Sequence, residues 1–143
     1  MIELKPISQA DLDFVRENPL EGAVKQYPYI PAPSDNAFSA FWDGELVGVG
    51  GLVVYWEGVG EMWLMLTKNC RRDGIDGVKA LLAIKRTIDE LIEKNGLWRA
   101  QATVRTDFPQ ACRMVEALGF EKEGLLKQYC PDKADVYMYA RII

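Results

Sequence analysis

Two long apolar stretches organise the middle of the chain. Residues 45–56 and 61–67 are almost entirely apolar, a pattern typical of strands that are buried on both faces. Asp43-Gly44 stands directly before the first stretch, and this pair favours a tight type I′ turn because both residues accept positive φ angles. The sequence therefore predicts a hairpin of residues 37–42 and 45–56, followed by a third strand at 61–67.

The N-terminal part of the chain predicts one strand and one helix. Ile2 and Leu4 fall on the same face of a short strand, and Ser8 stands where a helix N-cap is expected, ahead of residues 11–18. Residues 19–35 contain four prolines and no sustained period, which predicts a short helix fragment within an irregular loop.

The next part of the chain alternates between helix and strand periods. Apolar residues recur every three or four positions from 78 to 91, which predicts a long helix that Asn95-Gly96 ends. Apolar and polar residues then alternate over 98–105, as in a strand with one polar face. Because the strands that flank a crossover helix run parallel, residues 98–105 are predicted to pair with 61–67. The helical stripe consists of Val78, Leu81, Ile84, Ile88 and Leu91.

The C-terminal third predicts a short helix and two further strands. Asp107 and Gln110 have the spacing of a capping box, and the apolar stripe behind them closes at Gly119. Residues 120–130 and 134–143 carry strand patterns.

Composition limits the chemistry that the chain can perform. With 143 residues and 49% hydrophobic content, residues 1–143 suit a single domain with its own core. The chain contains no histidine and three widely spaced cysteines, so we predict reduced thiols, no metal site and no histidine-based catalysis. A net charge of −4 argues against nucleic acid as a partner. The sequence shows neither a membrane-spanning stretch nor a secretory signal, and we expect a cytoplasmic protein that does not bind membranes.

The stretch in front of the long helix suggests an anion site. Arg71, Arg72, Gly74 and Gly77 stand where backbone N–H groups and the positive end of the helix dipole face an incoming phosphate. A competing interpretation makes Asp76 the helix N-cap and leaves the arginines solvated. The loop by itself does not decide between these interpretations. Its cations outnumber its acids, with Lys68, Arg71, Arg72 and Lys79 against Asp73 and Asp76.

The order of predicted elements resembles that of the GCN5-related N-acetyltransferase (GNAT) family along the whole chain. Three features carry the resemblance: the apolar strand 61–67 that leads into the Arg/Gly loop, the segment FPQACRMVEALGF, and the terminal pair of strands. In the segment, Ala111 precedes Gly119-Phe120 by eight positions, as in the late motif of the family, and GFEKEGLLKQY is similar to the branch that acetylates the N-termini of ribosomal proteins. The resemblance implies an α/β (α+β) fold, with a mixed sheet of about seven strands and helices on both faces.

The coenzyme loop of the family is matched only in part. The family pattern is Arg or Gln, two residues, Gly, one residue, then Gly or Ala. From Arg71 the first glycine is Gly74, but Asp76 occupies the second glycine position. From Arg72 the second glycine is Gly77, but Ile75 occupies the first.

Two later positions also depart from the family. Phe108 stands where the family often has asparagine, and Val115 where it often has tyrosine, although the ribosomal-type branch frequently lacks that tyrosine.

The resemblance implies roles for particular residues. Acetyl-CoA would be the co-substrate, with its pyrophosphate at residues 71–77 and no metal involved. The strand 61–67 would diverge from the strand at 100–104 and leave amides near Leu64, Met65 and Leu66 free for the pantetheine arm and the thioester carbonyl.

The same resemblance suggests an acid and a base. Glu61 would take the amine proton through water, although a glutamate at a strand end is more often a solvated turn residue. A tyrosine of the terminal strands would protonate the leaving thiolate, and of Tyr129, Tyr137 and Tyr139 we select Tyr129, although most tyrosines in such strands only pack.

The resemblance leads to one main functional hypothesis and one alternative. The main hypothesis is an N-acetyltransferase that moves an acetyl group from acetyl-CoA to the amine of a small molecule or a protein N-terminus by direct attack. The alternative is a GNAT-fold structural or binding protein whose catalytic features have decayed, such as the phage virion and tail-assembly proteins of this fold. A homodimer is left open.

Overall fold

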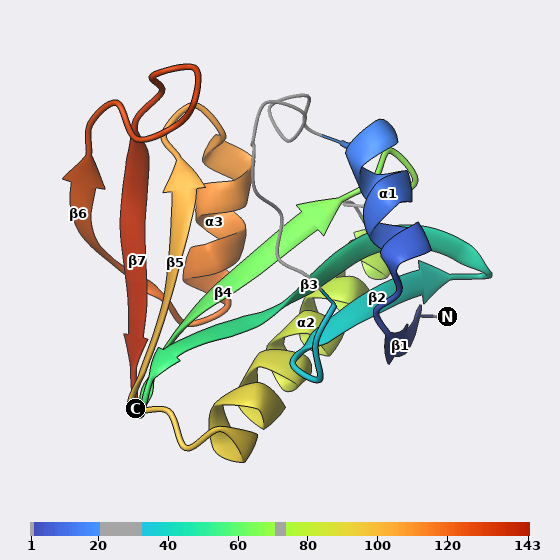
Figure 1. Ribbon diagram of the computed structural model, residues 1–143. Coiled ribbons are helices and arrows are strands. Elements are labelled where there is room, and N and C mark those ends of the chain that lie inside the picture. The colour runs from blue at the N-terminus through green and yellow to red at the C-terminus, as the bar shows by residue number, and fades with distance from the viewer. Residues whose placement is uncertain (1, 21–32, 71–73) are drawn as a thin grey trace.

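The computed structural model describes residues 2–20, 33–70 and 74–143, with the backbone alone for residues 74–76. It contains a seven-stranded mixed sheet with helices on both faces, which confirms the predicted fold class (Figure 1). The elements are β1 (Ile2–Pro6), α1 (Gln9–Glu17), β2 (Ala37–Trp42), β3 (Glu45–Trp56), β4 (Val59–Leu66), α2 (Gly74–Lys94), β5 (Arg99–Arg105), α3 (Pro109–Ala117), β6 (Glu121–Leu126) and β7 (Val136–Ile142).

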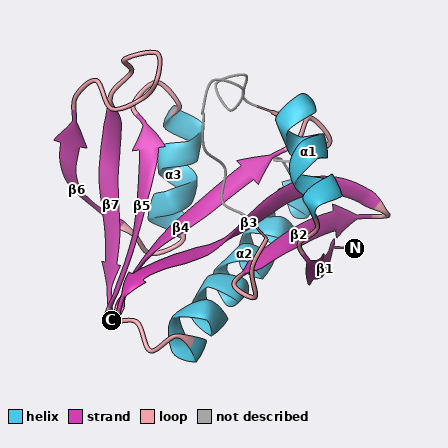
Figure 2. Ribbon diagram, viewed as in Figure 1, coloured by secondary structure: helices cyan, strands magenta, loops and turns pink. Residues whose placement is uncertain are grey.

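The strands follow the order β1-β2-β3-β4-β5-β7-β6 across the sheet. Every neighbouring pair is antiparallel except β4 and β5, which run parallel on either side of the crossover through α2, as predicted. The last strand, β7, lies between β5 and β6, so the terminal hairpin joins the sheet through its second strand (Figure 2).

Several local predictions are confirmed by backbone geometry. Asp43 and Gly44 have φ angles of 50° and 85°, as a type I′ turn requires. The hydroxyl of Ser8 accepts a hydrogen bond from the Asp11 N–H at 3.1 Å and so caps α1. Gly96, with a φ of 59°, follows the end of α2.

The predicted capping box of α3 is wrong. The N-cap residue is Phe108, which makes no side-chain cap hydrogen bond, and the helix begins at Pro109. The Asp107 carboxylate instead accepts two hydrogen bonds from Arg105, at 2.9 and 3.0 Å. Hydrogen bonds between ionised groups are stronger than those to a neutral backbone N–H. The Asp107 carboxylate therefore binds the Arg105 guanidinium and not the N–H groups at the start of α3.

The hydrophobic core consists of two clusters, one on each face of the sheet. On one face α2 and α3 cover Leu52, Met62 and Tyr139, and on the other α1 packs over Leu46 and Val49. This arrangement explains why β3 and β4 are apolar on both faces.

Helix α2 is buried mainly toward its C-terminal end. Ile88 and Leu91 belong to the core, as the predicted stripe requires. Val78, from the same stripe, is 52% exposed, and the buried residues of α2 among those with described side chains, Ile88, Leu91 and Ile92, lie in its second half.

Three observations concern the chemistry that composition suggested. All three cysteines are free thiols. Within residues 2–20, 33–70 and 74–143, no three histidine, cysteine or acidic side chains are grouped closely enough to hold a metal ion. No helix in that same part of the chain is both long and apolar enough to cross a membrane.

Candidate active site

Strands β4 and β5 are paired only at one end. Three residue pairs join them: Val59 with Arg99, Gly60 with Ala100, and Glu61 with Gln101. Beyond Glu61 the two strands diverge, as the green and orange arrows show in Figure 1. The sheet therefore keeps its hydrogen bonds between β4 and β5 near residue 60 and lacks them further along β4.

The register of β4 decides which of its amides face this gap. The Thr67 N–H donates to the Val47 carbonyl at 2.9 Å, which makes this a hydrogen-bonded pair. Since hydrogen-bonded and non-hydrogen-bonded pairs alternate along an antiparallel ladder, Met65 also bonds to β3, while Leu64 and Leu66 point their N–H groups toward β5. Of the three predicted positions, Met65 is thus assigned to the β3 ladder.

The side chains of β4 support this division. Trp63 and Met65 pack with the cluster under α1, whereas Leu64 is 37% exposed. The carbonyl of Leu66 accepts a hydrogen bond from the Leu20 N–H at 2.9 Å, so the far end of the strand is tied to the segment after α1.

The predicted coenzyme loop falls at the start of α2. Arg71 and Arg72 lie outside the described residues. Residues 74–77, which are Gly74, Ile75, Asp76 and Gly77, form the first turn of the helix. The N–H groups of a first turn have no partner within the helix, so this turn has donors for an anion.

The interpretation of Asp76 as an N-cap is wrong, because α2 begins two residues earlier, at Gly74. The orientation of the Asp76 carboxylate lies outside the described side chains.

Glu61 and Gln101 meet at the last pair of the parallel ladder. The Gln101 Nε2 donates a hydrogen bond to the Glu61 Oε1 at 3.3 Å, and both residues are partly buried. Sequence reasoning missed Gln101, although the alternating pattern of 98–105 already placed it on the polar face of a strand predicted to lie beside Glu61.

Tyr129 lies in the loop between β6 and β7 and is 54% exposed. Its pKa is raised above the ordinary tyrosine value, mainly by burial and further by the negative charges of Glu61 and Cys130. The phenol therefore keeps its proton over a wider pH range.

Arg105 fixes the loop that carries Tyr129. Its guanidinium binds the Asp132 carboxylate with two hydrogen bonds of 2.9 and 3.0 Å while also binding Asp107, and it lies 5.1 Å from the centre of the Phe108 ring. Only 11% of the Arg105 side chain is exposed. These contacts join the end of β5, the start of α3 and the β6–β7 loop, and sequence reasoning did not identify them.

The loop is also fixed by its own backbone. The N–H groups of Tyr129 and Cys130 both donate to the Ala134 carbonyl at 3.1 Å. The Gln128 N–H donates to the Asp135 Oδ1 at 2.8 Å. These hydrogen bonds therefore hold the main chain at Tyr129 in place.

The other two tyrosines of the terminal strands have different surroundings. Tyr139 is fully buried, and its hydroxyl donates to the Glu116 Oε2 at 2.7 Å. Burial, followed by that hydrogen bond, raises its pKa far above the ordinary value. Tyr137 lies under the Lys122 ammonium group, which is 3.8 Å from the ring centre. Both residues therefore pack within or against the core.

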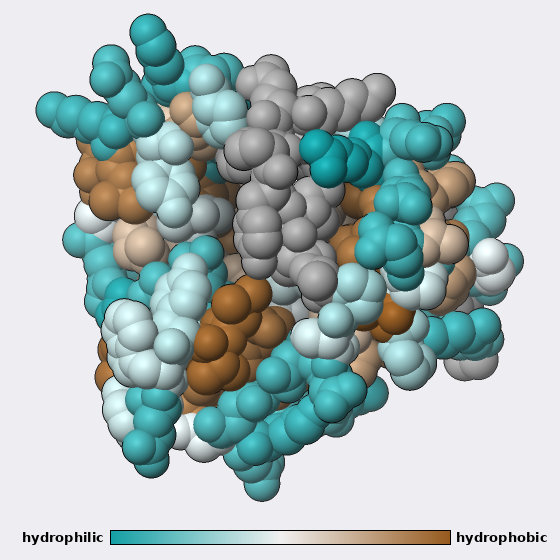
Figure 3. Space-filling model, viewed as in Figure 1, coloured by the Kyte–Doolittle hydropathy of each residue, from teal (hydrophilic) through white to brown (hydrophobic). Residues whose placement is uncertain are grey.

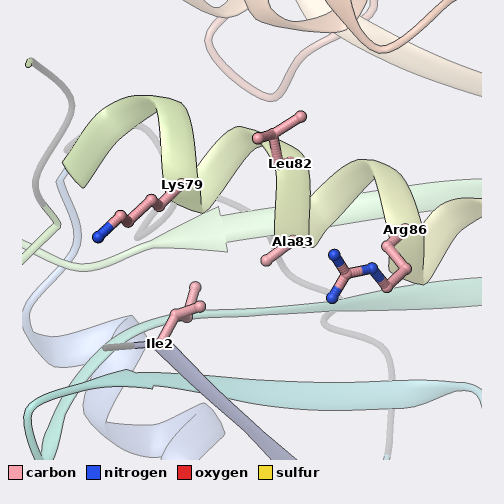
Figure 4. Close-up of a pocket in the computed structure, with 5 residues that line it drawn as sticks. All are labelled: Ile2, Lys79, Leu82, Ala83 and Arg86. Atoms are coloured by element: carbon pink, nitrogen blue, oxygen red, sulfur yellow. The ribbon is translucent and has the colours of Figure 1, made fainter. Parts of the chain in front are cut away.

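A separate groove of about 370 Å³ lies between α2 and β1. Figure 4 shows Ile2 on one side of it and Lys79, Leu82, Ala83 and Arg86 of α2 on the other. Lys79, which was counted with the positive charge of the coenzyme loop, thus lines a groove beside β1. Among the predicted site residues whose side chains are described, none contributes to its lining.

The geometry of this region can be compared with known proteins. The sequence profile of the "Acetyltransferase (GNAT) family" matches residues 4–120, which is most of the chain. The chain belongs to the GNAT family. This confirms the family that the residue pattern suggested. GNAT acetyltransferases transfer acetyl groups to amines, and this is the general activity that membership supports. Comparison with curated protein sequences gave no match.

Solved GNAT structures share the fold of this family member over nearly its whole length. The spermidine N-acetyltransferase of Vibrio cholerae in complex with CoA and spermine is 20% identical, with a TM-score of 0.74 over 99% of this chain and 95% of that one. A GNAT-family acetyltransferase of Bacillus anthracis is 19% identical, with a TM-score of 0.75 over 99% and 94%. Ard1 of Thermoplasma volcanium is 19% identical, with a TM-score of 0.73 over 99% and 97%. At these identities the likeness concerns the fold.

Proposed function

We propose that this GNAT protein transfers an acetyl group from acetyl-CoA to a primary amine by direct attack. The observation that carries the proposal is the early end of pairing between β4 and β5. It leaves the N–H group of Leu64 directed into a gap, on the strand that leads to the first turn of α2, whereas at Leu66 the same edge of the strand is bordered by Pro19 and Leu20.

The backbone would hold the coenzyme at two places. The backbone of β4 at Leu64 would bind the pantetheine arm and the acetyl oxygen, where negative charge develops during attack. The first-turn amides of residues 74–77 would bind the pyrophosphate, with charge-assisted hydrogen bonds from Arg71 and Arg72. Both kinds of contact use the main chain, which explains how the sites can tolerate an imperfect glycine pattern.

Side chains on the other part of the gap would move the protons. Glu61, held by Gln101, would accept the proton of the attacking amine through a water molecule. The amine nitrogen then forms its bond to the acetyl carbon while the carbon–sulfur bond breaks. Tyr129, whose pKa is raised, would give its proton to the thiolate that leaves.

The acceptor we propose is a cationic amine on a small molecule or at a protein N-terminus. Glu61 supplies negative charge for such a group, and the chain as a whole has a net charge of −4. A structural neighbour that was solved with CoA and spermine gives an example of the small-molecule class. The late motif GFEKEGLLKQY favours the protein class.

Thermal unfolding in the presence of acetyl-CoA tests coenzyme binding. A ligand that binds only the folded state at a hundred times its dissociation constant adds about 2.7 kcal/mol, which raises the midpoint of a domain of this size by several degrees. The double variant Arg71→Ala, Arg72→Ala should lose most of this shift while its own midpoint without ligand stays unchanged. Absence of any shift with acetyl-CoA or CoA would refute the proposal.

An assay for free CoA thiol tests the chemistry. Wild-type protein should release CoA from acetyl-CoA when spermine or a short peptide with a free N-terminus is added, and it should not do so with the N-acetylated peptide. Coenzyme binding without turnover on any amine would support the alternative of a GNAT-fold binding protein.

A further inference from the structure

One leucine in the middle of the sheet keeps an exposed side chain. The helices cover β3 and β4 incompletely, and on the face that Figure 3 shows, apolar side chains stay visible over these strands, between α1 and β5. On the opposite face, under α2 and α3, Met62 is buried in the core. Leu64 follows two residues later on that same face of β4, but it is 37% exposed.

The neighbours of Leu64 explain this exposure. On one side it pairs with Gly50 of β3, which has no side chain to cover it. On the other side β5 has already diverged, since the last residue pair between β4 and β5 joins Glu61 and Gln101. The leucine therefore lies beside the gap between β4 and β5, without an apolar side chain paired to it on either strand.

The Leu64 side chain leans over β3 and not into the gap. Its Cδ1 atom lies 3.1 Å from the position that a Cβ would take on Gly50. The Cβ atoms of residues paired across two strands are about 4.5–5.5 Å apart, so the end of the leucine lies nearer to β3 than its own Cβ does. Leu66 leans in the same way over Gly48, where its Cδ2 lies 2.9 Å from the corresponding position. The two glycines thus provide the space in which the leucines lie.

The position of Leu64 places its side chain next to the acyl group. This step rests on the proposed function, in which the Leu64 backbone binds the acetyl oxygen. The acyl carbon then lies beside the side chain of the same residue. The exposed part of that side chain is roughly 50 Å², whereas one methylene covers about 30 Å². An acyl chain with one or two carbons more than acetyl would therefore cover the leucine.

We propose that Leu64 and Gly50 set the length of the acyl group that the site accepts. Leu64 forms an apolar floor for straight-chain acyl groups, and Gly50 keeps this floor out of the gap by giving the side chain room over β3. The ligands that follow are CoA thioesters of short fatty acids, propionyl-CoA and butyryl-CoA, in addition to acetyl-CoA. Gly50 acts through Leu64 and is therefore a positioning residue.

Calorimetry with a series of CoA thioesters tests the proposal. In the wild-type protein the affinity should rise from acetyl-CoA to propionyl-CoA and butyryl-CoA, by up to about fourfold for each methylene that packs on Leu64. Leu64→Asn keeps the approximate size of the side chain but makes it polar, so this rise should disappear. The measurement requires neither an amine nor turnover.

Gly50→Ala tests the role of the glycine. The new Cβ would meet the Leu64 Cδ1 at 3.1 Å and the Trp63 carbonyl oxygen at 2.9 Å, so the leucine must turn toward the gap. The ratio of the butyryl-CoA affinity to the acetyl-CoA affinity should then fall at least tenfold. The double variant Gly50→Ala, Leu64→Ala lacks the displaced side chain and should relieve most of this loss.

Gly48→Ala is the matched control. Its Cβ would meet the Leu66 Cδ2 at 2.9 Å and the Met65 carbonyl oxygen at 3.1 Å, which is comparable crowding. The edge of β4 that faces β5 is bordered there by Pro19 and Leu20, so this variant should keep the wild-type ratio of affinities.

Circular dichroism checks the fold of each variant. A wild-type affinity that stays level or falls from acetyl-CoA to butyryl-CoA would overturn the proposal, whether or not Gly50→Ala folds. The same ratio of affinities in wild type and in folded Gly50→Ala would also overturn it. Absence of binding by CoA and acetyl-CoA alike would instead refute the proposed function, and the inference with it.

Discussion

Gly58 in the β3–β4 turn provides a quantitative test of the packing at the strand ends. Its φ is +83°, and a Cβ at this position would lie 2.2 Å from the Cδ2, Cε2 and Cε3 atoms of Trp98. Gly44 has nearly the same φ, +85°, but a Cβ there meets no atom within 4 Å. The pair Gly58→Ala and Gly44→Ala therefore separates the cost of the Trp98 contact from the cost of the backbone conformation.

The expected losses in the free energy of unfolding differ by a factor of about three between the two substitutions. An alanine in the left-handed region costs about 1 kcal/mol, so this is the prediction for Gly44→Ala. In Gly58→Ala the Trp98 ring must leave its place, because carbon atoms in contact keep about 3.5–4.0 Å. Trp98 is 54% exposed, so its departure loses roughly 100 Å² of buried surface, or about 2 kcal/mol. The prediction for Gly58→Ala is therefore about 3 kcal/mol in total.

Urea unfolding followed by circular dichroism measures both free energies of unfolding. The decisive control is the same substitution in a Trp98→Ala background, where Gly58→Ala should cost no more than Gly44→Ala. Equal costs for the two glycines in the wild-type background would refute the reasoning. So would a cost of about 3 kcal/mol for Gly58→Ala that persists without the Trp98 ring.

Three further predictions concern the candidate site. Glu61→Gln keeps the shape of the side chain but removes the base, so kcat/KM for the amine should fall by about 10²–10⁴ while the affinity for acetyl-CoA stays unchanged. The control Glu57→Gln, in the nearby turn, should not change kcat/KM. Equal activity of the two variants in steady-state kinetics would remove Glu61 from the mechanism. Asp76→Gly should tighten acetyl-CoA binding in calorimetry by removing a negative charge from the first turn of α2, and weaker binding would show that Asp76 organises the turn instead. Its midpoint without ligand should fall slightly, since glycine is less favourable than aspartate in a helix by about 0.3 kcal/mol. Hydrogen bonds from Arg105 lower the pKa of Asp107 below its ordinary value of 3.8. The pair therefore stabilises the fold fully above pH 3.8 and loses its contribution as the pH falls through the lowered pKa. Asp107→Asn should flatten that part of the curve of unfolding free energy against pH, and an unchanged curve would contradict the assignment.

Much of the candidate site could be predicted because its main parts are backbone features. The parallel pairing of residues 98–105 with 61–67 follows from the crossover rule, and the long helix over 78–91 follows from the hydrophobic period, although its start at Gly74 does not. The side-chain contacts could not be predicted in this way. Gln101 binds Glu61 across 40 positions of sequence, and Arg105 binds Asp132 across 27. The alternating pattern places Gln101 on the polar face of its strand, but only the register of β4 against β5 decides that it meets Glu61.

The sequence by itself determined the features that depend on neighbouring residues and on which face of an element is apolar. The Asp43-Gly44 turn, the Ser8 cap and the parallel crossover are of this kind, because backbone sterics and burial act on short segments. Only the tertiary structure decided where β4 diverges from β5 and that β7 lies between β5 and β6. It also decided that the Asp107 carboxylate binds Arg105 and does not cap α3. In each of these cases several partners could bind the same side chain or strand edge. Which partner binds depends on the residues that the rest of the fold places next to it.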